Sequence, residues 1–228
     1  MKTLKILGAA AAVAAFVSFS NAADAAVIDF TSSTQFPSIN AQPLTGSVHG
    51  RSFQVTSQPG GSVFGTDGIN AGKCSGLSLA CDRDGLGVSN DEIDGDRESI
   101  TIEFSSLINV VEFYVLDLFT SRNGRNQEVG SYRTFDGTTW SNLIDFTADS
   151  NEVVNSGDIG FLAVAVNLPV KAIEWSYSGA NDNVGVGDYA VAGLAVTPLP
   201  AAAWFLLTGL GGLAGMRWLR KDRAADAA

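Results

Sequence analysis

The chain has 228 residues, of which 46% are hydrophobic, so it is long enough to bury a core and too apolar for a disordered chain. Glycine is abundant at 25 residues and proline sparse at 6, which favours a turn-rich all-β domain over helices. The stretch 27–197 holds 8 Lys/Arg and 21 Asp/Glu, and its net charge of −13 argues against nucleic acid and anionic lipid as partners.

The chain begins with a predicted secretory signal peptide. Two early lysines precede Ile6–Phe19, a run of apolar and small residues, and small residues follow at two peptidase sites. We expect signal peptidase to cut after Ala25, with Ala22 as the alternative site. A retained membrane anchor is the other interpretation, but the run is short and rich in alanine. The signal peptide is therefore residues 1–25.

Apolar and polar residues alternate with a period of two between residues 26 and 196. The alternation is clearest in Ser99–Phe104, in Val110–Phe119 and in Ile173–Tyr177, and it predicts half-buried strands. Asp136-Gly137 is a hairpin signal. Further strands are expected at Val27–Thr31, Phe53–Thr56, Glu128–Phe135, Thr138–Phe146, Phe161–Val166 and Asp188–Val196.

About nine strands in one domain predict two packed antiparallel sheets. The expected ectodomain, residues 26–196, is therefore a β-sandwich or jelly roll. Several aromatic residues share the inward parity of their strands, and we expect them in the core rather than against a ligand. These are Phe30, Phe53, Phe104, Phe113 and Trp175.

Cys74 and Cys81 are the two cysteines, with six residues between them. In an exported chain this spacing predicts one small disulfide loop. Zinc is not expected, because the one histidine, His49, is far away in the sequence and further ligands are missing. A redox CxxC motif is absent.

An acidic, glycine-rich segment follows the second cysteine. Seven carboxylates lie within residues 82–98, and hard cations such as calcium prefer oxygen ligands on flexible backbone. Calcium is therefore a candidate structural ion, although the segment is no EF-hand and a solvated acidic loop explains it equally. The preferred ligands are Asp91, Glu92, Asp94 and Asp96.

Signals for catalysis are weak. His49 lies in Ser47-Val-His-Gly-Arg51, which has no nucleophile elbow, so a serine hydrolase is not expected. Paired carboxylates of a glycosidase arise by chance in a β-domain with 21 acidic residues. We therefore expect no enzyme.

The C-terminal end carries a predicted transmembrane helix, at about residues 199–219. Leu199–Met216 contains no charge and as a helix would span about 27 Å, close to the hydrocarbon thickness of a bilayer. A buried core helix would explain the apolar run but not the basic stop beside it. Basic residues stay on the cytoplasmic side, so the domain is expected outside the membrane. The basic residues are Arg217, Arg220, Lys221 and Arg223.

The residues Thr197-Pro198-Leu199-Pro200-Ala201, the apolar helix and the basic cluster resemble the PEP-CTERM sorting signal in its VPLPA variant. The resemblance covers residues 197–223. It implies that exosortase, an integral-membrane cysteine protease, processes an intermediate anchored in the inner membrane. It also implies a Gram-negative source and delivery to the cell surface or the extracellular space. The sorting motif is Pro198, Leu199, Pro200 and Ala201.

A second resemblance lies in the ectodomain. Gly85-Leu-Gly-Val88, Asp91-Glu-Ile-Asp94 and Glu98–Phe104 follow in the order of a motif that many exported PEP-CTERM proteins share. Those domains resemble carbohydrate-binding jelly rolls, so this resemblance supports the fold rather than an activity.

Together these features predict an exported cell-surface or extracellular-matrix protein without enzymatic activity, whose candidate ligand is exopolysaccharide. A secreted glycan hydrolase and a purely structural matrix or adhesion protein are the alternatives. A binding protein needs exposed aromatic residues on one sheet, whereas a hydrolase needs a cleft with two facing carboxylates.

Overall fold

Ten β-strands and no helix make up the part of the chain that the computed structural model describes. That part comprises residues 24–39, 42–59, 64–65, 77–89, 92–95, 97–154, 157–177 and 188–199. Within it no helix is long and apolar enough to cross a membrane, and nearly all of the predicted signal peptide and membrane helix lies outside it. The strands are β1 (Ala26–Asp29), β2 (Leu44–Val48), β3 (Arg51–Gln58), β4 (Phe64–Gly65), β5 (Gly87–Val88), β6 (Ser99–Leu116), β7 (Val129–Phe135), β8 (Ile144–Thr147), β9 (Leu162–Tyr177) and β10 (Ala190–Thr197).

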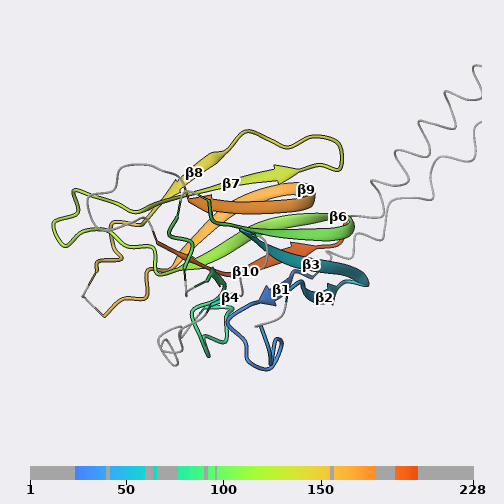
Figure 1. The fold of residues 1–228 in the computed structure, drawn as a ribbon, viewed down its shortest axis with the longest axis horizontal. Coiled ribbons are helices and arrows are strands. Elements are labelled where there is room, and N and C mark those ends of the chain that lie inside the picture. Colours follow the sequence, from blue (N-terminus) through green and yellow to red (C-terminus); the bar gives the residue numbers. More distant parts are fainter. Residues whose placement is uncertain are drawn as a thin grey trace, which may run out of the picture. The chain divides into compact units, whose positions relative to one another are not determined.

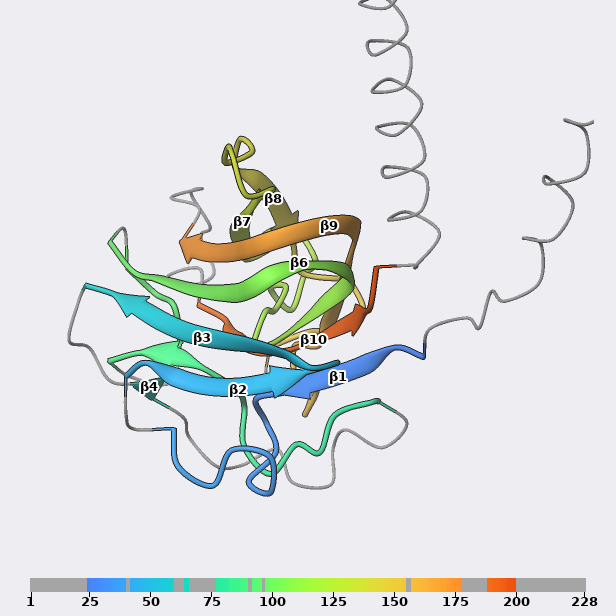
Figure 2. The same ribbon diagram turned by 90° about the vertical axis from the view of Figure 1, so that its right-hand side faces the viewer.

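Eight of these strands form one antiparallel sheet. Its main path runs β1-β10-β6-β9-β7-β8, and β3 joins β6 with β2 on its far side. The short strands β4 and β5 pair separately. Figures 1 and 2 show β9, β6 and β3 as neighbouring ribbons in this order. The prediction of an all-β domain is confirmed.

Strand β6 holds two sets of partners. Its first half, up to Phe104, pairs with β3, and its second half, from Asn109, pairs with β10 on the same edge. Strand β9 follows both halves on the other edge, with an irregularity between Glu103 and Ile108. Such an irregularity bends a strand while the pairing continues on either side of it.

Two of the predicted strand divisions are wrong. Ser99–Phe104 and Val110–Phe119, the latter up to Leu116, belong to the single strand β6. Phe161–Val166, from Leu162 on, and Ile173–Tyr177 belong to the single strand β9. The exposed residues Ser105 and Ser106 interrupt the alternation in β6 without ending the strand, because the bend places them outside the regular pairing.

The bent sheet encloses one main core. Buried residues of β3, β6, β9 and β10 form a single cluster, so the inward faces of the two ends of the sheet meet. Strands β1 and β2 lie side by side in both views (Figures 1 and 2). His49, in the turn between β2 and β3, has its Nε2 3.3 Å from the carbonyl oxygen of Val196 on β10.

Phe113 is the centre of an aromatic group in this core. Its ring lies edge-on to Tyr132, Phe146 and Trp175, with centroid distances of 5.0, 5.3 and 5.6 Å. Edge-to-face pairs of this kind add to the stabilisation from burial itself. The predicted core residues Phe30, Phe53, Phe104, Phe113 and Trp175 are all buried, so that prediction is confirmed.

A second, smaller core covers the opposite face of β10. Leu79 and Cys81 pack there with Tyr114 and Leu116, so β10 is buried on both faces. Hydrogen bonds fix the segment around Leu79 and Cys81 that covers this face. Asp29 Oδ2 accepts one from the Ala80 N–H at 2.7 Å, and Thr31 Oγ1 accepts one from the Cys81 N–H at 2.8 Å. Cys81 is disulfide-bonded, and Cys74 lies outside the described residues.

Gly130 on β7 tests this packing. A Cβ at this position would overlap the Phe146 ring and lie 2.8 Å from Tyr189 Cε1. We expect Gly130→Ala to lower the free energy of unfolding by about 1–3 kcal/mol through overpacking. Urea denaturation measures the change. Gly95→Ala is the matched control, because its Cβ would lie 3.5 Å from Glu98 Cγ, an ordinary contact. Equal stability of the two variants would contradict the packing described here.

Candidate functional site

Strand alternation gives one half of the sheet a polar outer face. Phe53 on β3, Ile102 on β6, Ile173 on β9 and Tyr132 on β7 are buried in the core, so their neighbours along each strand point away from it. We call the surface formed by these outward residues of β2, β3, β6, β9 and β7 the outer face.

One row of the outer face crosses five strands. The register pairs Thr45 with Gln54, Gln54 with Glu103, Glu103 with Ala172 and Ala172 with Phe135. Neighbouring strands are about 4.8 Å apart, so this long row extends about 19 Å from β2 to β7. It carries a hydroxyl, an amide and a carboxylate at one end and an aromatic ring at the other.

At the aromatic end, Trp140 lies against Phe135 and Arg133. The Phe135 and Trp140 ring centroids are 5.2 Å apart at 31°, and Arg133 Cζ lies 4.7 Å from the Trp140 centroid. Trp140 nevertheless remains 38% exposed. We call Trp140, Phe135 and Arg133 the Trp140 platform. An exposed indole that is fixed by its neighbours offers a flat apolar surface beside polar groups.

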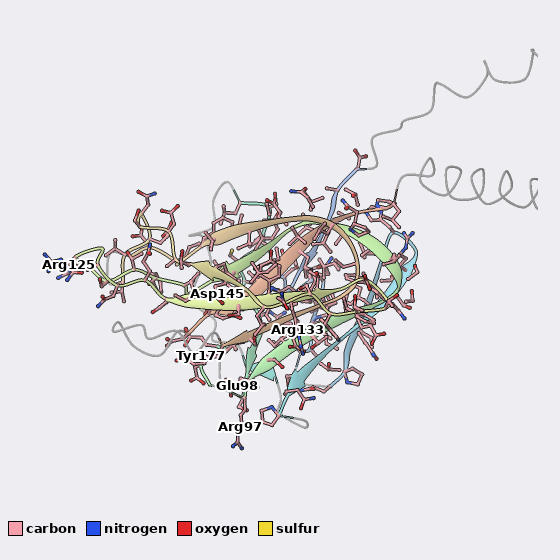
Figure 3. The ribbon with its side chains drawn as sticks, turned by 90° about the horizontal axis from the view of Figure 1, so that it is seen from above. Arg97, Glu98, Arg125, Arg133, Asp145 and Tyr177 are labelled. Atoms are coloured by element: carbon pink, nitrogen blue, oxygen red, sulfur yellow. The ribbon has the colours of Figure 1, made fainter. Side chains whose placement is uncertain are left out.

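Arg133 is itself fixed by an ion pair within the outer face. Its Nη2 lies 2.8 Å from Glu174 Oε1, and the register places the two residues opposite each other on β7 and β9. Figure 3 shows Arg133 and Asp145 on the side of the domain formed by β7 and β8. A half-exposed pair contributes little to stability, but it orients the guanidinium that covers the Trp140 ring.

The turn from Phe135 to Trp140 is held by Asp136. Its Oδ1 accepts hydrogen bonds from the Thr138 and Thr139 N–H groups at 2.7 and 2.8 Å. The Thr139 bond, and then that from Thr138, lowers the pKa of the Asp136 carboxyl. The Asp136-Gly137 hairpin prediction is confirmed, but the predicted strand Thr138–Phe146 is wrong, because pairing with β7 resumes as a strand only at Ile144.

The polar end of the long row lies in an open depression of about 600 Å³ over β2, β3 and β6. Gly46, Phe53 and Phe104 contribute to its lining, and all of its other lining residues are polar. The exposed polar residues that line it are Thr45, Ser47, Ser52, Gln54, Glu103 and Ser105.

Charges on the outer face are largely balanced. Arg133 pairs with Glu174 at 2.8 Å, and Lys171 Nζ lies 3.9 Å from Glu103 Oε1. Asp145 on β8 accepts a hydrogen bond from the Ser131 hydroxyl at 2.6 Å. The outer face therefore differs from the chain as a whole, in which acidic residues exceed basic ones by ten.

The segment selected for calcium binding is anchored to the core by its apolar residues. Leu86, Val88 and Ile93 are fully buried. Leu86 exchanges two backbone hydrogen bonds with Val191 on β10, and the Ile93 N–H donates to the Tyr189 carbonyl at 2.9 Å. In its described residues, the Gly85–Asp94 motif thus packs along β10 through its apolar side chains.

Two carboxylates of this segment already accept hydrogen bonds from backbone N–H groups. Asp82 Oδ2 accepts from the Ser33 N–H and hydroxyl, which lower its pKa, the hydroxyl more strongly. Glu98 Oε2 accepts from the Asp94 N–H at 3.0 Å, and burial raises the pKa of Glu98. Figure 3 shows Glu98 at the border of the domain, apart from Arg133.

Of the four preferred calcium ligands, Glu92 and Asp94 are described, whereas Asp91 and Asp96 lie outside the described residues. Among the residues with described positions, no group of three or more histidine, cysteine or carboxylate side chains is arranged to hold a metal ion. Calcium binding by this segment stays a prediction.

Other predicted site residues are only partly described. Pro198 and Leu199 follow β10 directly, while Pro200, Ala201 and the basic residues Arg217, Arg220, Lys221 and Arg223 lie outside the described residues.

The sequence patterns do not single out Trp140, Arg133 or Gln54. The one sequence signal near Trp140 is the Asp136-Gly137 turn, which Trp140 follows after two threonines.

The pKa of Asp136 provides a test of the turn. Because its folded-state pKa is depressed, Asp136 stabilises the turn above the usual aspartate pKa, and this contribution is lost as pH falls through the folded value. We expect NMR titration to place its midpoint below that of an unstructured aspartate. Asp136→Asn should remove the pH dependence of the Thr138 and Thr139 amide signals. A midpoint at or above the usual value would contradict the two hydrogen bonds.

Comparison with known proteins identifies no family. No protein-family model and no curated protein matches the chain. Among solved structures, the chain is similar to the crystal structure of the C-terminal domain of a chitobiase from Bacteroides fragilis, with 16% identity and a TM-score of 0.26. The match covers 45% of this chain and 63% of that one, so the chain spans less than two thirds of that structure's length. Function has to be inferred from the chain's own residues.

Proposed function

We propose that this chain is an exported bacterial envelope or matrix protein whose β-domain binds polysaccharide through the outer face. The observation that carries the proposal is the Trp140 platform, an indole that is 38% exposed, contacts Phe135 and Arg133, and lies at one end of the long row. Binding rather than catalysis is the activity proposed.

The platform suits the chemistry of a sugar ring. A pyranose has an apolar face of C–H groups and a rim of hydroxyls, so it stacks on an indole while its rim forms hydrogen bonds. Arg133 and Glu174 lie beside the indole, with a donor and an acceptor for such hydroxyls. Because the rings are already packed, little side-chain entropy is lost on binding.

The architecture of the sheet also supports polysaccharide binding. We infer that the bent antiparallel sheet is a β-sandwich of the jelly-roll type, because both of its ends contribute to one core while the outer face stays free of that core. An open sheet face suits an extended polymer better than a deep pocket would.

Export is supported by the termini and by cysteine chemistry. Cys81 is disulfide-bonded, as is usual for proteins of oxidising compartments. Pro198 and Leu199 continue directly from β10, so a sorting signal at residues 197–201 would begin where the folded domain ends. The resulting route is signal peptidase, then a membrane-anchored intermediate, then an exosortase-type protease.

A glycan hydrolase is the second candidate, since Glu103 and Glu174 occupy diagonal positions on β6 and β9. The Cα atoms of diagonal neighbours lie about 7–8 Å apart, so the two carboxylates project from neighbouring positions of the outer face. Arg133 Nη2 lies 2.8 Å from Glu174 Oε1 and Lys171 Nζ lies 3.9 Å from Glu103 Oε1, so both carboxylates are already engaged by basic side chains of the outer face. The pairing therefore favours binding.

Trp140→Ala tests the binding function. We expect it to weaken retention by polysaccharide about tenfold in affinity electrophoresis, because removing an aromatic ring on which a ligand stacks costs about 1–3 kcal/mol. Leu168→Ala is the control, since Leu168 is 48% exposed and pairs with Val110 in the other half of the sheet. Release of reducing ends by the wild-type protein would favour the hydrolase. No retention by any polysaccharide would favour a structural matrix protein.

Mass spectrometry of the mature protein tests the proposed export route. We expect an N-terminus at Ala26 or Ala23 and the loss of residues beyond the sorting motif. Replacing Pro198 and Pro200 by alanine should leave the C-terminal segment attached. A mature chain that retains both Met1 and Ala228 would exclude this route.

A further inference from the structure

We propose that the depression over β2, β3 and β6 is a second subsite of the outer face, and that it and the Trp140 platform together select an uncharged glycan chain lying across the strands. This inference rests on the proposed function and adds to it the class of ligand and the direction of binding.

The lining of the depression is rich in groups that match sugar hydroxyls. Four of its exposed side chains are serine or threonine hydroxyls, which both donate and accept hydrogen bonds. Gln54 adds two donors and an acceptor, and Glu103 adds acceptors. A ligand with many hydroxyls satisfies such a surface, whereas an apolar ligand would leave these groups without water or partners.

Beneath these side chains lies a packed layer of aromatic rings. Phe53 and Phe104 are both buried, with ring centroids 6.1 Å apart at 64°. Gly46 allows the Phe53 ring to lie under β2, because a Cβ at this position would come within 2.9 Å of Phe53 Cε1. The depression is thus held in shape by the core.

Charge indicates an uncharged ligand. Glu103 is the one ionisable side chain among the residues that line the depression, and Lys171 Nζ lies 3.9 Å from it. At the other end of the row, Arg133 is engaged by Glu174. No unpaired basic cluster is present on the described outer face to hold an acidic sugar, and the stretch 27–197 repels polyanions through its net charge of −13.

The two subsites share one line across the sheet. Thr45, Gln54 and Glu103 in the depression continue through Ala172 to Phe135, which contacts Trp140. Ala172 has the smallest side chain of this row and is only 3% exposed, so neighbouring side chains cover it and it does not itself project between the two ends. Because the row is about 19 Å long, a single sugar cannot occupy both ends, whereas an oligosaccharide can.

Affinities of a disaccharide and a hexasaccharide test this inference. The full-length protein in mild detergent is titrated by calorimetry with neutral β-glucan, xylan and chitin oligosaccharides and with acidic oligogalacturonate. Gln54→Ala should weaken binding of the neutral hexasaccharide about three- to tenfold, the effect of one lost hydrogen bond, and leave disaccharide binding unchanged. Trp140→Ala should weaken both.

Gln58→Ala is the matched control. Gln58 is the same residue type on the same strand β3 and is also exposed, but it pairs with Ser99 and does not line the depression. It should leave both affinities unchanged.

Three results would overturn the inference. Equal hexasaccharide affinity of Gln54→Ala and wild type would remove the second subsite while leaving the function at Trp140 intact. Tighter binding of the acidic hexasaccharide than of every neutral one would overturn the ligand class. Binding of no oligosaccharide or polysaccharide would remove the proposed function and this inference together.

Discussion

The long, bent strand β6 is the constraint on which the rest of the structure depends. Its two halves pair with β3 and with β10 on one edge, while β9 follows both on the other edge. Phe104 and Phe113, one in each half, therefore belong to the same core. The inward residues of β6 fix the register of its neighbours, since a slip by one residue would expose every buried side chain of a strand. The outer face inherits its side-chain rows from that register.

The polar outer face and the aromatic core are two consequences of one alternation. Where Ile102 and Phe104 point inward, Glu103 between them must point outward. The same rule places Gln54 between Phe53 and Val55. A row of side chains that spans five strands, with polar groups at one end, thus needs no special loop or cofactor. Its precision comes from buried residues that no ligand would touch, and mutations in the core would disturb binding indirectly.

Local patterns predicted much of the fold but little of the site. Phe30, Phe53, Phe104, Phe113 and Trp175 were identifiable because inward parity is a property of a single strand. The strands β6 and β9 were predicted in pieces, because a bend interrupts the local pattern while pairing with distant strands continues. The long row could not be predicted from the sequence, because its residues come together only through the register of separate strands. Four strands contribute Thr45, Gln54, Glu103 and Ala172.

The acidic segment shows what composition alone leaves open. A count of carboxylates selected it as a cation site, yet its apolar residues Leu86, Val88 and Ile93 are what anchor it to β10 and Tyr189. Asp82 and Glu98 are engaged by backbone N–H groups, which are the donors that irregular chain leaves unpaired near a sheet edge. Acidic side chains in such a segment thus accept hydrogen bonds that stabilise the fold. A sequence pattern does not distinguish these carboxylates from metal ligands. Trp140 shows the converse case, because a single aromatic residue gives no pattern, and only the contacts with Phe135 and Arg133 distinguish a fixed platform from an incidental surface residue.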